Sequence, residues 1–203
     1  MERSAGILLP IFSLPSRYGI GSLGAEARAF ADFLKAAGQK WWQILPVGPT
    51  GAGDSPYTSV STFAGNPLFI DLELLEKDGL LDVEDLKAAE VAEKDRIDYA
   101  ALRVGREPLL RKAAGRLLEK DAPAVERFAA ETKWVADYAL YRAAQTHFGG
   151  QPWYNWPDAD LRRHEAEAVR LWRQILSEEV WYYTAVQYLF FTQWKYFFSY
   201  PFS

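Results

Sequence analysis

The sequence of 203 residues contains no cysteine, only two histidines and a single methionine. The absence of cysteine excludes disulfides, Cys-ligated zinc and a thiol nucleophile. A formal net charge of −4 at pH 7 disfavours nucleic acid as a partner, because nucleic-acid-binding domains usually carry a basic surface. The apolar segment near the N-terminus is short and contains Pro10 and Pro15, so we expect no signal peptide and a cytoplasmic protein.

Histidine and glycine motifs provide no clear metal or nucleotide site. His147 and His164 have no carboxylate or histidine partner at ligand spacing, which predicts capping or surface histidines. Residues 19–24 match GxGxxG, but residues 15–18 separate them from the preceding expected strand and no acidic residue follows the next one. Residues 48–55 have P-loop spacing, but Asp54 stands where the phosphate-binding lysine is required. We therefore expect no cofactor and no metal.

Aromatic residues are abundant, with 8 Trp, 11 Tyr and 12 Phe, and they concentrate near the C-terminus. In the segment from Trp181 to Phe202, Lys195 is the only charged residue. Gln187 and Gln193 interrupt this segment, and a membrane span needs about 20 consecutive, predominantly apolar residues. We therefore expect a buried helix with a large packing partner and no contact with a membrane.

The first 47 residues predict a strand, a helix and a second strand. Residues 6–14 and 41–47 are short apolar runs, which favour strands covered on both faces. Between them, Ser22 is a candidate N-cap and Gly38 a candidate C′ residue. The expected core face of this helix consists of Ala29, Phe30, Phe33, Leu34 and Ala37. Such a unit builds parallel sheets and barrels, so the fold class is α/β.

The chain then becomes loop-like and afterwards helical. A loop rich in Gly, Pro, Ser and Thr is expected from Gly48 to about Pro67. Asp71 and Glu73, two residues apart on an expected strand, share a face, but nothing places a sugar between them. Helical spacing then recurs in four segments without an intervening strand, which predicts a helical insertion in an α/β fold; the segments are residues 83–93, 98–120, 124–148 and 159–177.

The loop from Gly51 to Asn66 is the candidate site. It places small polar groups, the Asp54 carboxylate and the Tyr57 ring just after a buried strand, where α/β folds assemble their sites. A sugar suits this mixture, because its hydroxyls bind polar groups and its C–H face stacks on an aromatic ring. The alternative is a purely structural loop, with an Asx turn at Asp54 and Tyr57 buried.

Three long segments of this region resemble the N-terminal part of the 4-α-glucanotransferases, also called amylomaltases or disproportionating enzymes, of glycoside hydrolase family 77. These segments are residues 13–24, residues 41–51, and residues 53–57 with residues 63–67, in the same order and spacing as in the family. Shorter similarities extend the resemblance to about residue 195; they are residues 137–141, 147–150, Trp153, residues 156–157, 187–191 and 193–195.

The resemblance implies a (β/α)8 barrel with helical insertions and a retaining transfer of α-1,4-glucan segments between maltooligosaccharides. It also implies that Ser55 and Tyr57 contact the glucan, while Asp54 and Asn66 shape the loop. Some relatives carry an aromatic residue for a second glucan chain at the position of Ala52, so we do not expect that contact here.

The family's catalytic carboxylates correspond to positions beyond residue 203, so no residue here is assigned a catalytic role. We expect an incomplete barrel with three parts: residues 1–80 with the glucan-binding loop, a helical insertion at 81–177, and an aromatic helix at 178–203 that diverges from about residue 196. A truncated product of this kind is expected to aggregate or to expose a large apolar patch, and to be inactive alone. The alternative function is a standalone maltodextrin-binding or interaction module, and the sequence predicts no oligomeric state.

Overall fold

The computed structural model describes residues 3–92 and 95–200, which form two compact units. The N-terminal unit comprises residues 1–116 together with residues 189–203, and the helical unit comprises residues 117–188. Two long helices, α4 (Tyr99–Glu131) and α8 (Ser177–Phe198), contribute residues to both units. These divisions differ from those expected at residues 80 and 177, and the expected domain division stays a prediction.

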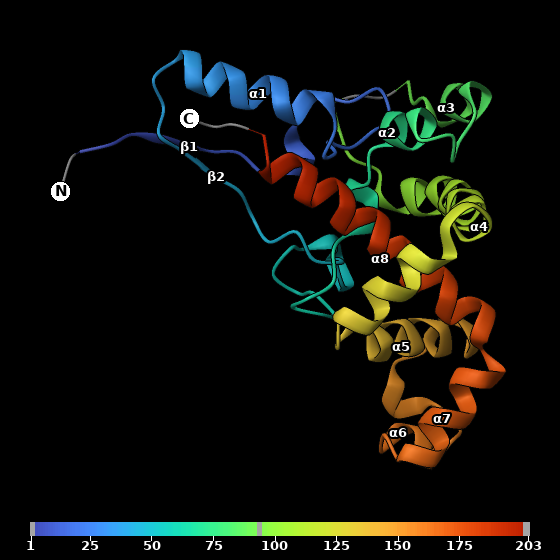
Figure 1. The fold of residues 1–203 in the computed structure, drawn as a ribbon. Helices are drawn as coiled ribbons and strands as arrows, with labels where there is room; N and C mark the ends of the chain where they lie inside the picture. Colours follow the sequence, from blue (N-terminus) through green and yellow to red (C-terminus); the bar gives the residue numbers. More distant parts are fainter. Residues whose placement is uncertain (1–2, 93–94, 201–203) are drawn as a thin grey trace. The chain divides into compact units, whose positions relative to one another are not determined.

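The N-terminal unit begins with a parallel β-α-β arrangement (Figure 1). Strand β1 (Gly6–Leu8) pairs in parallel with β2 (Trp41–Gln43), with Gly6 opposite Trp41, and helix α1 (Ala25–Ala36) connects them. The described chain is mostly helical with this small parallel sheet, which agrees with part of an α/β fold.

The observed strands are much shorter than the predicted ones. The predicted burial of both strands on both faces is wrong. After Pro10 the chain forms a 3₁₀ turn (Ile11–Ser13), because proline has no N–H to donate to a sheet ladder. All of β1 is exposed, and 66% of Trp41 is accessible to solvent. A strand is covered on both faces only in a sheet that other layers enclose, and within the described residues the sheet has two strands.

Helix α1 begins and ends through different mechanisms. Gly24 is the N-cap residue, so the expected Ser22 cap is wrong; the Ser22 hydroxyl donates to Asp71 at 2.7 Å instead. At the other end, Gly38 has a φ of +69° and lies at C′, as expected. The N–H groups of Gly38 and Gln39 donate to the carbonyls of Lys35 and Leu34, which completes a Schellman motif.

The predicted core face of α1 is correct only at Leu34. The buried residues are Ala27, Ala31 and Leu34, whereas 62% of Phe33 is exposed. The other expected core residues, Ala29, Phe30 and Ala37, are exposed or half-buried. The helix therefore leaves apolar side chains such as Phe33 exposed, while a large apolar patch and aggregation stay predictions.

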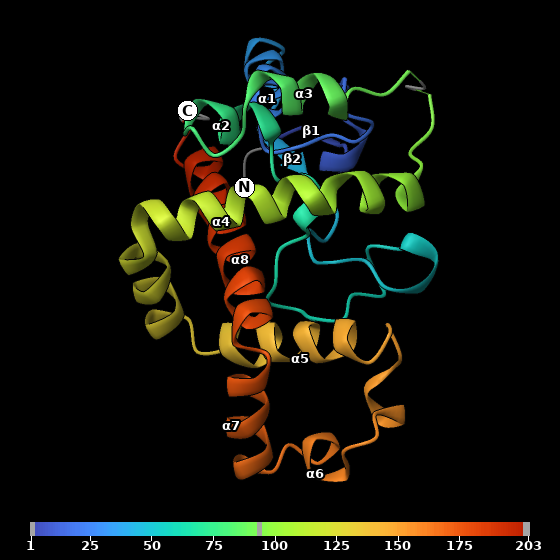
Figure 2. The ribbon, with the colours of Figure 1, turned by 90° about the vertical axis from the view of Figure 1, so that its right-hand side faces the viewer.

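Short elements complete the N-terminal unit: 3₁₀ turns at Ala52–Asp54 and Pro67–Phe69, helices α2 (Leu72–Lys77) and α3 (Val83–Ala89), residues 99–116 of α4 and residues 189–198 of α8 (Figure 2). The expected strand at Asp71 and Glu73 is wrong. Asp71 is the N-cap residue of α2, since its Oδ1 accepts from the N–H of Leu74 at 2.9 Å, and Glu73 lies in the first turn.

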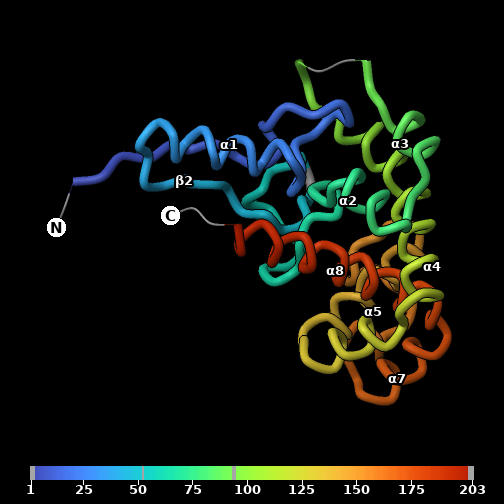
Figure 3. The backbone as a smooth tube through the Cα atoms, turned by 45° about the horizontal axis from the view of Figure 1, so that its top comes forward, coloured from blue at the N-terminus to red at the C-terminus, as the bar shows by residue number. Residues whose placement is uncertain are grey.

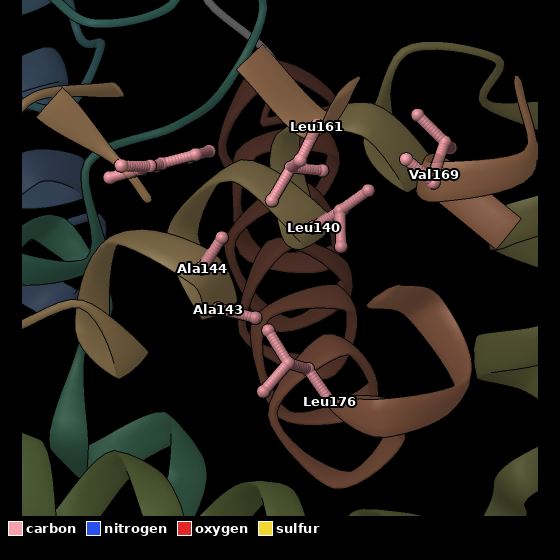
Figure 4. Packing of buried hydrophobic residues seen from close by; sticks show 8 residues of the cluster. Leu140, Ala143, Ala144, Leu161, Val169 and Leu176 are labelled. Carbon is pink, nitrogen blue, oxygen red and sulfur yellow. The ribbon is translucent and has the colours of Figure 1, made fainter. Parts of the chain in front are cut away.

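The helical unit consists of residues 117–131 of α4, helices α5 (Val135–His147), α6 (Ala159–Arg162) and α7 (Ala166–Ile175), a 3₁₀ turn at Trp153–Asn155, and residues 177–188 of α8. Figure 3 shows the course of the chain through α5 and α7. The core of this unit contains mainly small and aliphatic side chains (Figure 4). They are Leu140, Ala143, Ala144, Trp156, Leu161, Ala168, Val169 and Leu176.

One predicted helix break is confirmed, and two predicted helical segments are interrupted. The break expected between residues 120 and 124 is the kink at Asp121 within α4, where the backbone is not helical and the Asp121 carboxylate accepts from the N–H of Ala124. The segment expected at residues 124–148 is interrupted between α4 and α5. The chain leaves the helix only after Glu131. The segment expected at residues 159–177 is interrupted near His164, whose φ is +58°, a left-handed conformation that a helix does not contain.

Helix α8 is the single helix expected from the aromatic segment. It buries Phe190 and Gln187 almost completely, while Tyr196 and Phe198 remain exposed. None of the helices over residues 3–92 and 95–200 is both long and apolar enough to cross a lipid bilayer.

Candidate functional site

The loop that follows β2 surrounds a hollow of about 510 Å³ in the N-terminal unit. This hollow lies beyond the carboxyl end of a parallel strand, the end at which α/β folds place their binding sites. Its lining combines hydroxyl groups with aromatic rings. The lining residues are Pro46, Val47, Gly48, Pro56, Tyr57, Ser59, Ser61, Thr62, Phe63, Ala64 and Gly65 from the loop, and Phe190, Phe191 and Trp194 from α8.

Glycine is required where the loop packs against its surroundings. A Cβ at Gly65 would lie 2.0 Å from Cδ1 of Phe190, so the ring rests directly on the loop backbone. A Cβ at Gly51 would lie 2.2 Å from the carbonyl oxygen of Thr58, which brings the two ends of the short turn together. These close approaches fix the loop against α8 and against itself.

Ser55 and Tyr57, the predicted glucan contacts, lie in this turn. Ser55 Oγ accepts from the N–H of Tyr57 at 3.2 Å, and the Ser55 carbonyl accepts from the N–H of Thr58. The turn leaves 73% of Tyr57 exposed beside the hollow, so the alternative of a buried Tyr57 is wrong. Ser55 is half-buried next to the hollow and does not line it. The assignment of both as glucan contacts stays a prediction.

Asp54 makes its contacts away from the hollow. Its backbone has a φ of +57°, and its carboxylate forms an ion pair with Arg103 of α4. The same guanidinium donates to Thr50 Oγ1 at 3.4 Å and lies over the ring of Tyr99. Sequence analysis missed Arg103, because the pair joins residues that lie far apart in the chain.

Asn66 lies at the other end of the loop and is 97% buried, with 3% of its surface accessible. Its Oδ1 accepts from the N–H of Leu68 at 3.0 Å, and its own N–H donates to the carbonyl of Val47 at 2.8 Å. Its buried Nδ2 has no hydrogen-bond partner among the described residues. These contacts tie the end of the loop to the segment after β2, as a loop-shaping residue would.

A network of buried polar side chains joins α8 to the start of α2. Gln193 of α8 accepts from the N–H of Asp71 at 2.7 Å and donates to the Asp71 carbonyl at 3.0 Å. The Asp71 carboxylate accepts from Ser22 and Leu74, while Glu73 forms an ion pair with Arg17 at 2.9 Å. Neither carboxylate lines the hollow, and their rejection as a catalytic pair stays a prediction.

Burial shifts the pKa of two groups near this network. Burial lowers the pKa of the Arg106 guanidinium to about 10, and the nearby Asp71 carboxylate opposes that shift. Burial raises the pKa of the Tyr18 phenol to about 12, with a further contribution from the Glu73 carboxylate. Both groups keep their ordinary charge at neutral pH and serve as fixed parts of the scaffold.

The two histidines belong to the helical unit and do not line this hollow. Both histidines are exposed, as expected of surface histidines, and His164 Nε2 lies 3.4 Å from Asp137 Oδ1, a partner that the sequence spacing did not indicate. Asp137 also pairs with Arg173 at 2.7 Å, and the ring of His147 packs against Trp172. Over the described residues, no cluster of three or more His, Cys, Asp or Glu side chains could hold a metal ion.

Sequence analysis also missed the contribution of α8 to the hollow. Phe190 and Trp194 stack with ring centroids 5.9 Å apart, and Phe191 lies against Phe190 at 5.2 Å. The density of aromatic residues in this segment was visible in the sequence. Which of them face the loop depends on how α8 packs.

Comparisons with known proteins agree on one family. The sequence profile of the 4-alpha-glucanotransferase family matches residues 9–201. The 4-alpha-glucanotransferase of Thermus thermophilus is 45% identical over 96% of this chain, and that of Streptococcus pneumoniae is 43% identical over 95%. The chain spans 39% of the length of each of these relatives.

Solved structures show the same relationship. The amylomaltase from Streptococcus agalactiae in complex with acarbose superposes with a TM-score of 0.94 and 40% identity, covering 98% of this chain and 41% of that one. The amylomaltase from Corynebacterium glutamicum, 19% identical with a TM-score of 0.69, shares the fold over 94% of this chain and 27% of its own. With a profile match over nearly its whole length, this chain belongs to the 4-α-glucanotransferase family.

Proposed function

We propose that this chain is the N-terminal part of a cytoplasmic 4-α-glucanotransferase with a (β/α)8 barrel, and that its hollow binds α-1,4-glucan. The observation that carries the proposal is the lining of the hollow: the exposed Tyr57 ring and the rings of α8 face the same space as the hydroxyls of Ser59, Ser61 and Thr62. A glucose ring offers C–H faces for aromatic rings and hydroxyls for polar groups. A concave, largely apolar site with a few polar groups suits such a ligand.

The chemistry proposed for the whole enzyme is a retaining double displacement. A carboxylate nucleophile forms a covalent glucosyl intermediate, and a second carboxyl group protonates the leaving oxygen and later deprotonates the acceptor hydroxyl. None of the carboxylates in the described parts of the chain lines the hollow, so we assign this chain a binding role. Its groups would hold the glucan so that an acceptor sugar, rather than water, meets the intermediate.

Glucan binding is tested by titrating the chain with maltoheptaose in a calorimeter. We expect saturable binding, and we expect Tyr57→Ala to weaken it on the order of tenfold, equal to about 1.4 kcal/mol. Tyr154→Ala is the matched control, because Tyr154 is also an exposed tyrosine but lies in the helical unit. Equal affinities of the wild type and Tyr57→Ala would contradict the proposed role of the loop.

Activity is tested with maltotriose. We expect the purified chain to release no glucose and to form no longer maltodextrins, since binding groups without a nucleophile cannot form the covalent intermediate. Turnover by the purified chain would contradict a purely binding role. Sequencing the gene beyond the codon of Ser203 separates the proposal from a standalone module, because an enzyme requires further strands with Asp and Glu at their carboxyl ends.

A further inference from the structure

The serine and threonine hydroxyls that line the glucan hollow differ in how the loop uses them. Such a hydroxyl has one O–H donor and two acceptor sites. Ser59 Oγ donates to the carbonyl of Ser61 at 2.6 Å and accepts from the N–H of Ser61 at 3.2 Å. The loop therefore occupies the single donor of Ser59, and this hydroxyl stabilises the loop itself.

The hydroxyl of Ser61 is used in the opposite sense. Its Oγ accepts from the N–H of Phe63 at 3.2 Å and from the N–H of Ala64 at 3.1 Å. These two hydrogen bonds occupy both acceptor sites, so the O–H donor is what remains, and it has no acceptor within residues 3–92 and 95–200. The two N–H groups also polarise the hydroxyl, which strengthens it as a donor.

Thr62 brings a second unused donor to the same hollow. It is exposed, and its hydroxyl forms no hydrogen bond within the described parts of the chain. The next residue, Phe63, also lines the hollow, and 64% of its surface is exposed. Three consecutive residues thus present two O–H donors and an aromatic ring to one space.

The lining of the hollow carries no charge. Among its described residues there is no Asp, Glu, Lys, Arg or His. A charged ligand would lose its hydration there without gaining a counter-charge, which costs free energy. A neutral ligand with oxygen acceptors suits the hollow better, because an O–H donor that is covered without an acceptor loses its hydrogen bond to water. A sugar supplies such oxygens together with C–H groups for an aromatic ring.

We propose that residues 61–63 form a second sugar-contact segment of the hollow, besides Ser55 and Tyr57. The hydroxyls of Ser61 and Thr62 donate to hydroxyl oxygens of the bound glucan, and the Phe63 ring meets its C–H groups. This inference rests on the proposed glucan function and names the groups that recognise the sugar. Ser59 has no such role, because the loop already occupies its donor.

The donor role of Thr62 is tested with Thr62→Val, which removes the hydroxyl and keeps the branched shape of an exposed side chain. Calorimetric titration with maltoheptaose is expected to show binding weakened about fivefold, the effect of one neutral hydrogen bond. Thr192→Val is the matched control, because Thr192 is also exposed but lies on α8 outside the lining. Its affinity is expected to equal that of the wild type.

The role of Ser61 needs a second measurement, because Ser61→Ala also removes the acceptor of two backbone N–H groups. The ligands are maltotriose and derivatives of it that each lack one hydroxyl oxygen. Removing the oxygen that Ser61 contacts is expected to weaken binding to the wild type about fivefold and to leave binding to Ser61→Ala unchanged. Ser59→Ala is expected to keep the wild-type preference, because its hydroxyl acts only within the loop.

The outcomes separate this inference from the glucan function on which it rests. A wild type that binds maltoheptaose as tightly as Thr62→Val does, or a Ser61→Ala variant that keeps the wild-type preference among all the derivatives, would overturn the sugar-contact segment alone. Absence of maltoheptaose binding by the wild type would overturn the glucan function and the sugar-contact segment together.

Discussion

The two units of this chain satisfy their backbone hydrogen bonds in different ways. In the helical unit the backbone hydrogen bonds are satisfied mostly within helices, and the core is made of small and aliphatic side chains such as Ala143, Ala144 and Leu161. In the N-terminal unit long irregular segments join short elements, and their backbone groups need partners from elsewhere. Buried side chains such as Asp71 and Gln193 provide those partners.

The distribution of buried polar residues follows this difference. Within the described residues, the N-terminal unit holds five of them, Ser22, Asn66, Asp71, Arg106 and Gln193, and the helical unit holds Thr184 and Gln187. A candidate binding loop lies in the first unit and is built from irregular backbone. The comparison indicates that a loop capable of binding is held in place by specific polar contacts, which a single substitution can remove.

The largest expected effect tests the polar network. Asp71→Ala removes the acceptor of the Ser22 hydroxyl, the N-cap of α2 and the carboxylate near Arg106. We expect the free energy of unfolding of the N-terminal unit to fall by about 3–5 kcal/mol, measured by urea denaturation. Glu119→Ala, at an exposed position, is the control and is expected to change it by less than about 0.5 kcal/mol. A small effect of Asp71→Ala would remove the distinction between the units.

The helical unit is tested through its apolar core. Leu140→Ala leaves a cavity among packed side chains and is expected to lower the free energy of unfolding by about 2–5 kcal/mol, with the loss seen in hydrogen exchange of α5 and α7. Leu171→Ala is the matched control, because Leu171 lies on α7 and is half-exposed. Equal costs for the two variants would contradict the core as described.

A smaller effect is expected at the contact between the loop and α8. Gly65→Ala places a Cβ against the ring of Phe190, which must move, and we expect a loss of about 1–3 kcal/mol in unfolding free energy together with weaker maltoheptaose binding. Gly115→Ala is the control, and it is expected to raise the free energy of unfolding rather than lower it. Its Cβ meets nothing within 4 Å, so it should stabilise the chain by about 0.4–1 kcal/mol. Stabilisation by both changes would contradict the close approach at Gly65.

The smallest expected effect on stability at neutral pH concerns one buried tyrosine in each unit. The effect of the same two tyrosines is clearest at alkaline pH. Burial raises the pKa of Tyr18 and of Tyr138 to about 12 in the folded chain, whereas an unfolded tyrosine has a pKa of about 10. The folded state therefore holds the proton more tightly. The resulting stability is complete below pH 10 and is lost as the pH rises through about 12.

Two phenylalanine substitutions separate the units in this alkaline transition. Tyr18→Phe should reduce the alkaline loss of hydrogen-exchange protection in the N-terminal unit, and Tyr138→Phe in the helical unit, because phenylalanine has no proton to release. An alkaline transition that neither variant alters would contradict the assignment to these two residues.

Several features of the fold could be predicted because they depend on neighbours in the chain. The β-α-β order, the C′ glycine at Gly38 and the helical character after residue 72 follow from apolar spacing and from glycine's access to positive φ. The resemblance of short segments between residues 13 and 67 to one family was equally local, and the family comparison confirms the family.

The features that sequence analysis missed join residues far apart in the chain. Ser22 binds Asp71 rather than capping α1, and Asp54 pairs with Arg103. Their residue types were suitable for local roles, and only the packing of distant segments decided between the alternatives. The burial of the first strand was overestimated for the same reason, because burial depends on the layers that cover a strand.

The sequence by itself therefore determined the family, the order of the elements and the loop that carries the candidate site, because each rests on short segments whose residues act on their own backbone. Only the tertiary structure decided which aromatic rings of α8 face that loop, which polar side chains hold it, and that Arg106 is buried. These outcomes depend on contacts across more than 80 positions in the chain, such as the hydrogen bond from Arg106 to Tyr18, separated by 88 residues. Such contacts form only when the whole unit packs.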